Sequence, residues 1–125
     1  MGLEPDALVF DCSDPESVAV FWAAALGFEV DPDPQGSSLR DPSGRTKGIF
    51  LQRVPEPKTV KNRVHLDVRP TGSMAAEVER LQGLGATVRG YIEEGGSFWT
   101  QMRDVEGNEF CVLRGPEDGW SPDEL

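Results

Sequence analysis

Histidine, cysteine and long apolar runs are all scarce in this chain of 125 residues. No apolar run approaches the roughly 20 residues that a membrane-spanning helix needs, and no basic and then apolar leader opens the chain. The two cysteines, Cys12 and Cys111, stand far apart without a CxxC pair, each within an apolar run. We therefore expect two reduced thiols in the core of a cytoplasmic protein that does not contact a membrane.

Basic residues are also few compared with acidic ones. Twelve Lys and Arg residues against 22 Asp and Glu give a formal net charge of −10, which repels nucleic acid and anionic lipid, so neither is expected as a partner. The glycines fall at helix ends and turns, and no phosphate-binding loop, nucleotide fingerprint or Ser/His/Asp spacing is present. Part of the negative charge belongs to residues 115–125, an acidic tail unless Trp120 anchors it.

The first half of the chain predicts a strand, a helix and three more strands. Asp14 can cap the helix, Pro15 suits its first position, and Gly27 ends it. Between them, apolar residues fall on one helical face: Val18, Phe21, Trp22, Ala25 and Leu26. The strands are expected at 7–12, 28–30, 37–40 and 47–54, with turns at 31–36 and 41–44.

The second half repeats this order after a Pro-rich linker. A strand at 62–68 precedes a helix that is capped by Thr71 or Ser73 and ends at Gly85. Strands then follow at 86–92, 97–103 and 109–114, with turns at 93–96 and 104–107.

Three weak sequence matches, in the same order in both halves, indicate a duplication. They are Leu8–Asp11 with Val64–Asp67, Leu26–Val30 with Leu84–Val88, and Arg40–Gly44 with Arg103–Gly107. The prediction is a single α+β domain of two β-α-β-β-β modules, with curved mixed sheets around a cleft and helices on the outer faces. Its parts are module one (7–54), a linker (55–61), module two (62–114) and the tail (115–125).

The segment 62–68 holds the only histidine and alternates between apolar and polar residues. This period of two predicts a strand with Val64, Leu66 and Val68 against the second helix, and Arg63, His65 and Asp67 on the other face. That polar face either lies in solvent or lines the cleft, and the flanking pattern favours the cleft. The same parity points further residues inward: Val9, Asp11, Phe50, Gln52, Glu109 and Cys111, with Trp99 or Met102 as an apolar wall, depending on register.

Residues 7–114 resemble the vicinal oxygen chelate superfamily, which includes glyoxalase I, bleomycin-resistance proteins and extradiol dioxygenases. The residues that carry the resemblance are Asp14-Pro15, Phe21-Trp22, Leu26-Gly27-Phe28, Leu84-Gly85-Ala86-Thr87 and the turn Asp104–Phe110, where Val105 stands in place of the family's Pro. The stretches Lys58–Asp67 and Gly107–Cys111 are similar to a glyoxalase-like subgroup that is common in actinobacteria.

The resemblance implies a metal site on the first and last strand of each module, with His, Gln and Glu as ligands. The matching positions here are Ala7, Arg63, Cys111 and Phe50, or Gln52 in place of Phe50 if the register slips by two. These side chains do not make a divalent site, so we expect no metal cofactor there. A displaced divalent metal could take His65 and Glu109, with Gln52 and Asp67, in competition with Arg63 and Arg53.

These observations lead to a prediction of a protein that binds a small organic molecule in the cleft without the family metal. The alternative is a lyase or isomerase with His65 as acid/base beside Glu109 or Asp67, unless His65 only hydrogen-bonds one of these carboxylates and braces the two halves. A third possibility is a purely structural partner module. The predicted catalytic residues are His65 and Glu109, and the predicted ligand-binding residues are Asp11, Phe50, Gln52, Arg63, Asp67, Trp99 and Cys111. Pairing of modules across subunits, common in this fold, implies a homodimer.

Overall fold

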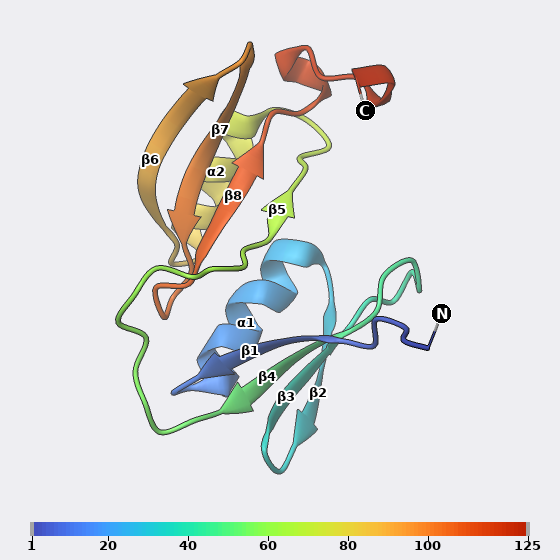
Figure 1. The fold of residues 1–125 in the computed structure, drawn as a ribbon, viewed down its shortest axis with the longest axis vertical. Coiled ribbons are helices and arrows are strands. Elements are labelled where there is room, and N and C mark those ends of the chain that lie inside the picture. The colour runs from blue at the N-terminus through green and yellow to red at the C-terminus, as the bar shows by residue number, and fades with distance from the viewer. Residues whose placement is uncertain (1, 125) are drawn as a thin grey trace. The chain divides into compact units, whose positions relative to one another are not determined.

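The structure is a computed structural model that describes residues 2–124, and the chain divides into two compact units. The boundary falls between Lys58 and Thr59, within the predicted linker. Each unit has the predicted β-α-β-β-β order, with one helix across one face of a four-stranded mixed sheet, so the α+β class is confirmed (Figure 1). Neither helix is long and apolar enough, over residues 2–124, to cross a bilayer.

The first unit is built on a sheet in the order β1-β4-β3-β2. Strand β1 runs parallel to β4, and the other neighbours are antiparallel. Its elements are β1 (Leu8–Cys12), α1 (Pro15–Leu26), β2 (Glu29–Asp33), β3 (Gly36–Arg40) and β4 (Ile49–Arg53).

The ends of α1 are the ones that the sequence predicts. The Asp14 side chain accepts a hydrogen bond from the Ser17 amide, and Pro15 occupies the first turn. Gly27 closes the helix with φ of 72°, a left-handed conformation that glycine adopts without strain. The apolar face is buried at Val18, Phe21 and Trp22, and the Trp22 ring packs edge-on against Phe10 and Phe21, with centroid separations of 5.9 and 5.1 Å.

The second unit repeats this plan with the sheet order β5-β8-β7-β6, in which β5 is parallel to β8. Gly95 and Gly96 connect β6 to β7, and both have positive φ, as a tight two-residue hairpin requires. Ser73 caps the second helix. The elements are β5 (Asp67–Val68), α2 (Met74–Gly83), β6 (Thr87–Glu94), β7 (Ser97–Arg103), β8 (Glu109–Leu113) and two short 3-10 helices, Pro116–Asp118 and Pro122–Glu124.

The predicted strand at 62–68 is wrong over most of its length. Only Asp67 and Val68 pair with β8, and the chain from Asn62 to Leu66 has no regular structure. Val64, expected to be buried against α2, is 76% exposed. The carbonyl of Leu66 still accepts a hydrogen bond from the amide of Cys111, 2.9 Å away, so the segment reaches β8 one residue before the strand begins.

The segment after β8, predicted as a tail unless Trp120 anchors it, is fixed to the start of α2. One oxygen of Asp118 accepts hydrogen bonds from the amides of Met74, at 2.7 Å, and Gly115, at 2.8 Å. The guanidinium group of Arg69 lies 4.0 Å from the centre of the Trp120 ring. The helix therefore has a second cap, from a residue 44 positions further along the chain.

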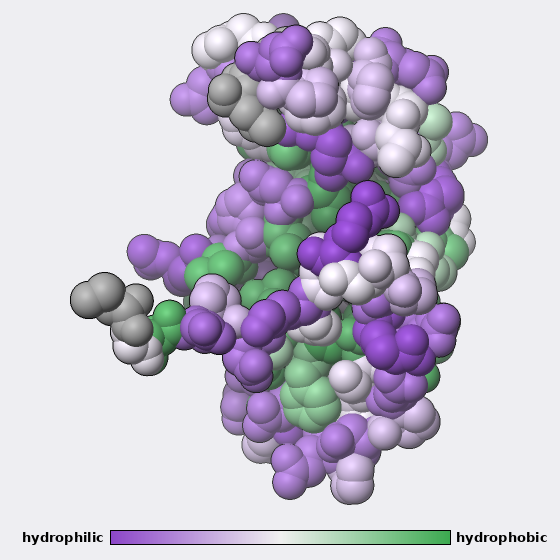
Figure 2. Space-filling view, turned by 90° about the vertical axis from the view of Figure 1, so that its right-hand side faces the viewer, coloured by the Kyte–Doolittle hydropathy of each residue, from purple (hydrophilic) through white to green (hydrophobic). Residues whose placement is uncertain are grey.

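The surface is mostly polar, as the charge of the chain suggests. Hydrophilic residues predominate on the face in Figure 2, and hydrophobic ones form scattered patches between them. Isolated apolar residues on a surface are normal in proteins and do not by themselves mark an interface.

Candidate functional site

The two faces of the second sheet differ in character. Thr100, Met102, Phe110 and Val112 are buried, and the hydroxyl of Thr100 contacts the sulfur of Met74 in α2, so this face packs against the helix. The opposite face, called here the helix-free face, carries alternate residues of β7 and β8 in register: Trp99 with Leu113, Gln101 with Cys111, and Arg103 with Glu109. The register places Trp99 on this face and Met102 on the face packed against the helix, and the part of Trp99 as an apolar wall stays a prediction.

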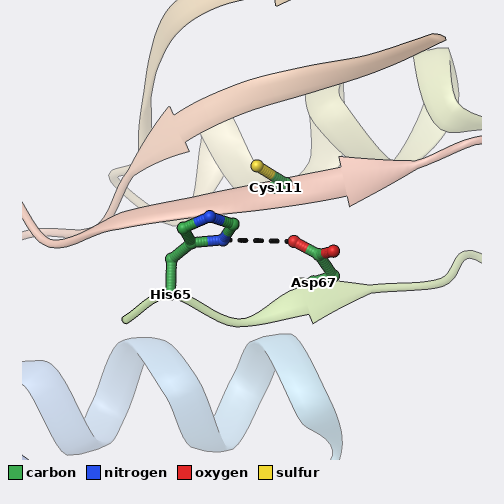
Figure 3. A group of neighbouring side chains, drawn as sticks. All are labelled: His65, Asp67 and Cys111. Carbon is green, nitrogen blue, oxygen red and sulfur yellow. Dashed lines mark ion pairs between the residues drawn. The ribbon is translucent and has the colours of Figure 1, made fainter. Parts of the chain in front are cut away.

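Three side chains meet beside this face at the start of β5. His65 Nδ1 lies 3.2 Å from Asp67 Oδ1. Cys111 is the register partner of Asp67 on the neighbouring strand β8. One potential ligand atom from each residue lies within 4.8 Å of the other two. Figure 3 shows His65 and Asp67, from the β5 segment, facing each other, with Cys111 on the neighbouring strand β8.

The members of this cluster differ in their access to solvent. The side chains of His65 and Asp67 are 36% and 51% exposed, whereas Cys111 is 4% exposed. The cluster therefore has a buried thiol at its base and two solvent-accessible polar groups at its rim. Such a gradient suits a site that a small molecule or ion enters from one side.

Burial raises the pKa of the Cys111 thiol to about 11, and the negative charge and hydrogen bonding of Asp67 act in the same direction. The positive charges of Lys61 and Arg89 lower this pKa, but by less. The thiol therefore keeps its proton at neutral pH, and it is not a thiolate nucleophile in this state.

Asp67 is the one of the two expected carboxylates that pairs with His65. Glu109 is buried, at 7% exposed, and its Oε1 accepts a hydrogen bond of 2.9 Å from the amide of Asn62. Its Oε2 lies 3.9 Å from Nε of Arg103. These are the contacts of a residue that holds the segment before β5 in place, and the catalytic role of Glu109 stays a prediction.

The predicted site residues of the first unit share one face of their own sheet. Asp11 is in register with Gln52, and Val9 with Phe50, on the parallel β1–β4 pair. All four lie on the face away from α1, as the parity predicted, because the alternate residues pack against the helix. The expected cleft between the sheets, and the part of these residues and of the exposed Arg63 in ligand binding, stay predictions.

Gln101, a further residue of the helix-free face, was not found from the sequence. Gln101 is in register with Cys111, and its side-chain oxygen accepts a hydrogen bond from Arg89 of β6. The available signal was the spacing of Gln101 two residues from Trp99, which places both on one face of a strand.

The four family metal positions do not fit a metal ion. Ala7 and Phe50 have no donor atom, and Arg63 carries a positive charge that repels a cation. Only Cys111 could serve as a ligand, and a single thiol does not make a divalent site.

A family model for the glyoxalase-like domain matches residues 7–113. The chain belongs to this family. The resemblance to the vicinal oxygen chelate superfamily is thereby confirmed, over the two repeated modules and up to the last residue of β8. A comparison with curated proteins finds no match.

Several solved structures have the same fold at low sequence identity. The hypothetical protein SA1046 from S. aureus is 18% identical, with a TM-score of 0.69, over 91% of this chain and 94% of its own. Lactoylglutathione lyase from Agrobacterium tumefaciens is 18% identical, with a TM-score of 0.63, over 94% and 97%. The E126Q mutant of the fosfomycin resistance protein FosX from Listeria monocytogenes, a complex with Mn(II) and a dihydroxypropylphosphonic acid, is 12% identical, with a TM-score of 0.72, over 92% of each chain.

Proposed function

We propose that this glyoxalase-like protein binds a small organic molecule on the helix-free face of its second unit, without a metal at the family positions. The observation that carries the proposal is the cluster of His65, Asp67 and Cys111, which places a nitrogen, a carboxylate and a thiol within 4.8 Å of one another. Binding sites for small molecules combine a few converging polar groups with apolar surface. Trp99 and Leu113, paired further along the same face, supply that surface.

A second candidate function is a lyase or isomerase reaction with His65 as acid/base. It is favoured by the distance of 3.2 Å between His65 Nδ1 and Asp67 Oδ1. A carboxylate at this position accepts the Nδ1 proton, fixes the orientation of the ring, and leaves the Nε2 lone pair to take a proton from a substrate. One of the solved structures with the same fold, the lactoylglutathione lyase above, is named as a lyase.

Replacement of His65 by alanine tests both candidates. In a thermal-shift screen of metabolites, we expect a compound that raises the melting temperature of the native protein to lose this effect in His65→Ala. The free energy of unfolding should change by less than about 1 kcal/mol, because the side chain is partly exposed and its contact with Asp67 faces solvent.

Val64→Ala is the matched control, since Val64 adjoins His65 in the sequence and is 76% exposed. It should keep the full ligand-induced shift. An equal shift in the native protein and in His65→Ala would contradict the proposed site. Turnover that is lost in His65→Ala, with normal binding, would favour the enzyme over the binding protein.

We also propose that the protein forms a homodimer. Each sheet ends in strands without a second neighbour within the unit, β1 and β2 in the first and β5 and β6 in the second, and proteins generally cover such edges. Light scattering at tens of micromolar should give about twice the chain mass of 13.7 kDa. A mass equal to that of one chain would contradict the dimer.

A further inference from the structure

We infer that the small molecule bound on the helix-free face is an apolar monocarboxylate, and that Arg89 and Lys61 hold its carboxylate. This inference rests on the proposed function and specifies the class of its ligand. It gives a role to two basic residues that lie outside the cluster of His65, Asp67 and Cys111.

The helix-free face carries an apolar row across three strands. Ile92, Trp99 and Leu113 are register partners on β6, β7 and β8, and cross-strand partners point to the same side of a sheet. All three are half-buried, so part of their apolar surface is accessible. Figure 1 shows this side of the second sheet toward the viewer, with α2 behind it. The row therefore offers a contact surface for the apolar part of a ligand.

A polar row lies beside the apolar one, two residues further along β7. It contains Gln101, Cys111 and Asp67, which are in register across β7, β8 and β5, and His65 contacts Asp67 at its end. Two residues of a strand span about 7 Å. One small molecule can therefore place an apolar group on the first row and a polar group on the second.

An irregularity in β6 brings Arg89 to the polar row. The register of β6 against β7 shifts between Val88 and Gly90, so Arg89 is the extra residue of a β-bulge. Gly90 takes the position opposite Gln101, and a Cβ atom there would meet only open space. The guanidinium group of Arg89 donates a hydrogen bond to the side-chain oxygen of Gln101. Bulges often redirect a side chain next to a functional site, and this one directs Arg89 over the helix-free face.

Arg89 retains donors for a ligand. A guanidinium group has five N–H donors in a planar fork that matches a carboxylate, and the contact with Gln101 uses one of them. Arg80 of the same unit is ion-paired with Glu77, whereas Arg89 has no ion pair with any carboxylate in residues 2–124. In a chain with 22 acidic residues, Arg89 is thus positioned for a carboxylate that the protein does not supply.

Lys61 adds a second positive charge near the polar row. Its Nζ donates a hydrogen bond of 3.3 Å to the carbonyl oxygen of Asn62. The amide of Asn62 is in turn bound by the buried Glu109 of β8, so this segment is fixed to the second sheet. Burial raises the pKa of Cys111, whereas the positive charges of Lys61 and Arg89 lower it. Both cations therefore act at the thiol in the middle of the row.

The local charge favours a monoanion. Lys61 and Arg89 face the single carboxylate of Asp67 at the thiol, which leaves one positive charge, and the next pair on this face, Arg103 and Glu109, offset each other. A carboxylate carries one negative charge, whereas a phosphate monoester carries about 1.5 to 2 at pH 7. The net charge of −10 on the chain does not prevent binding, because salt screens charges beyond about 8 Å.

Phenyl-substituted carboxylates, from benzoate to 4-phenylbutyrate, are suitable probes when each is compared with its neutral amide. In titration calorimetry with the whole chain, we expect at least one acid to bind at least 10-fold more tightly than its amide. The reason is that only the acid can accept charge-assisted hydrogen bonds from Arg89 and Lys61. This comparison needs no variant, so it does not depend on how a substitution affects folding.

Arg89→Met removes the charge and keeps an unbranched side chain. It should weaken binding of the acid about 10- to 100-fold and leave binding of the amide unchanged, and Lys61→Met should have a smaller effect of the same kind. Arg80→Met is the matched control, since Arg80 is an exposed arginine of the same unit whose partner is Glu77, and it should keep both affinities. Trp99→Ala should weaken the acid and the amide by the same factor, because the apolar row holds the part that they share.

Several results would overturn the inference. They are a panel in which no acid binds, amides that bind as tightly as the acids, acids that bind equally to the native protein and to Arg89→Met, and phenylphosphonate that binds more tightly than benzoate. A neutral metabolite whose thermal shift disappears in His65→Ala would contradict the ligand class and support the proposed function. An acid that needs Arg89 but binds normally to His65→Ala would support the ligand class and contradict the proposed part of the cluster.

Discussion

Replacement of Trp22 by alanine is expected to lower the free energy of unfolding by about 3–5 kcal/mol. Trp22 is 1% exposed and has the largest of the fully buried side chains. Its ring touches Phe10 of β1 and Phe21 of α1, so its removal leaves a cavity between the helix and the sheet of the first unit. The neighbouring rings can fill only part of that volume, which places the cost at the upper end for core truncations.

Urea denaturation of Trp22→Ala and Val20→Ala, in parallel with the native protein, measures this effect. Val20 lies two residues away on α1 and is 69% exposed, so its truncation should change the stability by less than about 0.5 kcal/mol. If both variants unfold at the native midpoint, or if Val20→Ala is the more destabilised, α1 does not bury the face described above.

Gly36→Ala is expected to lower the free energy of unfolding by about as much as Trp22→Ala, although it adds only one methyl group. A Cβ atom on Gly36 would stand 1.8 Å from the carbonyl oxygen of Leu51 and 2.9 Å from its carbonyl carbon, on the neighbouring strand β4. The obstacle is backbone, so no rotation of a side chain relieves it, and β3 must separate from β4. We expect a loss of about 3 kcal/mol or more, at or beyond the upper end for overpacking.

Gly90→Ala is the control for this steric clash. Gly90 also lies in a strand, β6, but a Cβ atom there would meet no heavy atom within 4 Å. Its replacement should change the stability by about 1 kcal/mol at most, and in the favourable direction if chain entropy dominates. Equal denaturation midpoints for the two variants would show that β3 and β4 are not as close as described.

The sequence predicts those parts of the fold that depend on local chemistry. Asp14, Pro15 and Gly27 mark both ends of α1 because a cap, a fixed φ and a left-handed residue each serve one position. The turn at Asp104 is equally local, since its side chain accepts hydrogen bonds from the amides of Glu106 and Asn108. These features need no information from distant residues.

The prediction of a strand at 62–68 failed because the alternation of apolar and polar residues describes where side chains point. It does not show whether the backbone pairs with a neighbouring strand. A strand also needs a neighbour for its backbone, and β8 offers β5 only two register pairs. Before that point, the amide of Asn62 is bound by the Glu109 side chain instead of a strand carbonyl. Nothing local in residues 62–66 records this long-range contact.

The sequence predicted only part of the candidate site, because the rest also depends on contacts between distant residues. His65 and Asp67 are two residues apart, so their proximity needed only a short extended segment. The meeting of both with Cys111 depends on the register of β5 against β8, and the depth of burial that raises the thiol pKa depends on the packed sheet. Parity indicated the shared face, but it did not distinguish Cys111 from Glu109 as the third member.

The contact of Asp118 with the start of α2 has a consequence for synthesis on the ribosome. Every strand of the first unit lies within residues 8–53, so its sheet can form while the rest of the chain is still being translated. In the second unit, β5 and α2 are translated before their partners. Strand β5 cannot pair until β8 has been made, and the second cap of α2 cannot form until Asp118 has been made. The half of the protein that carries His65 and Cys111 therefore reaches its final structure only after residue 118 has left the exit tunnel.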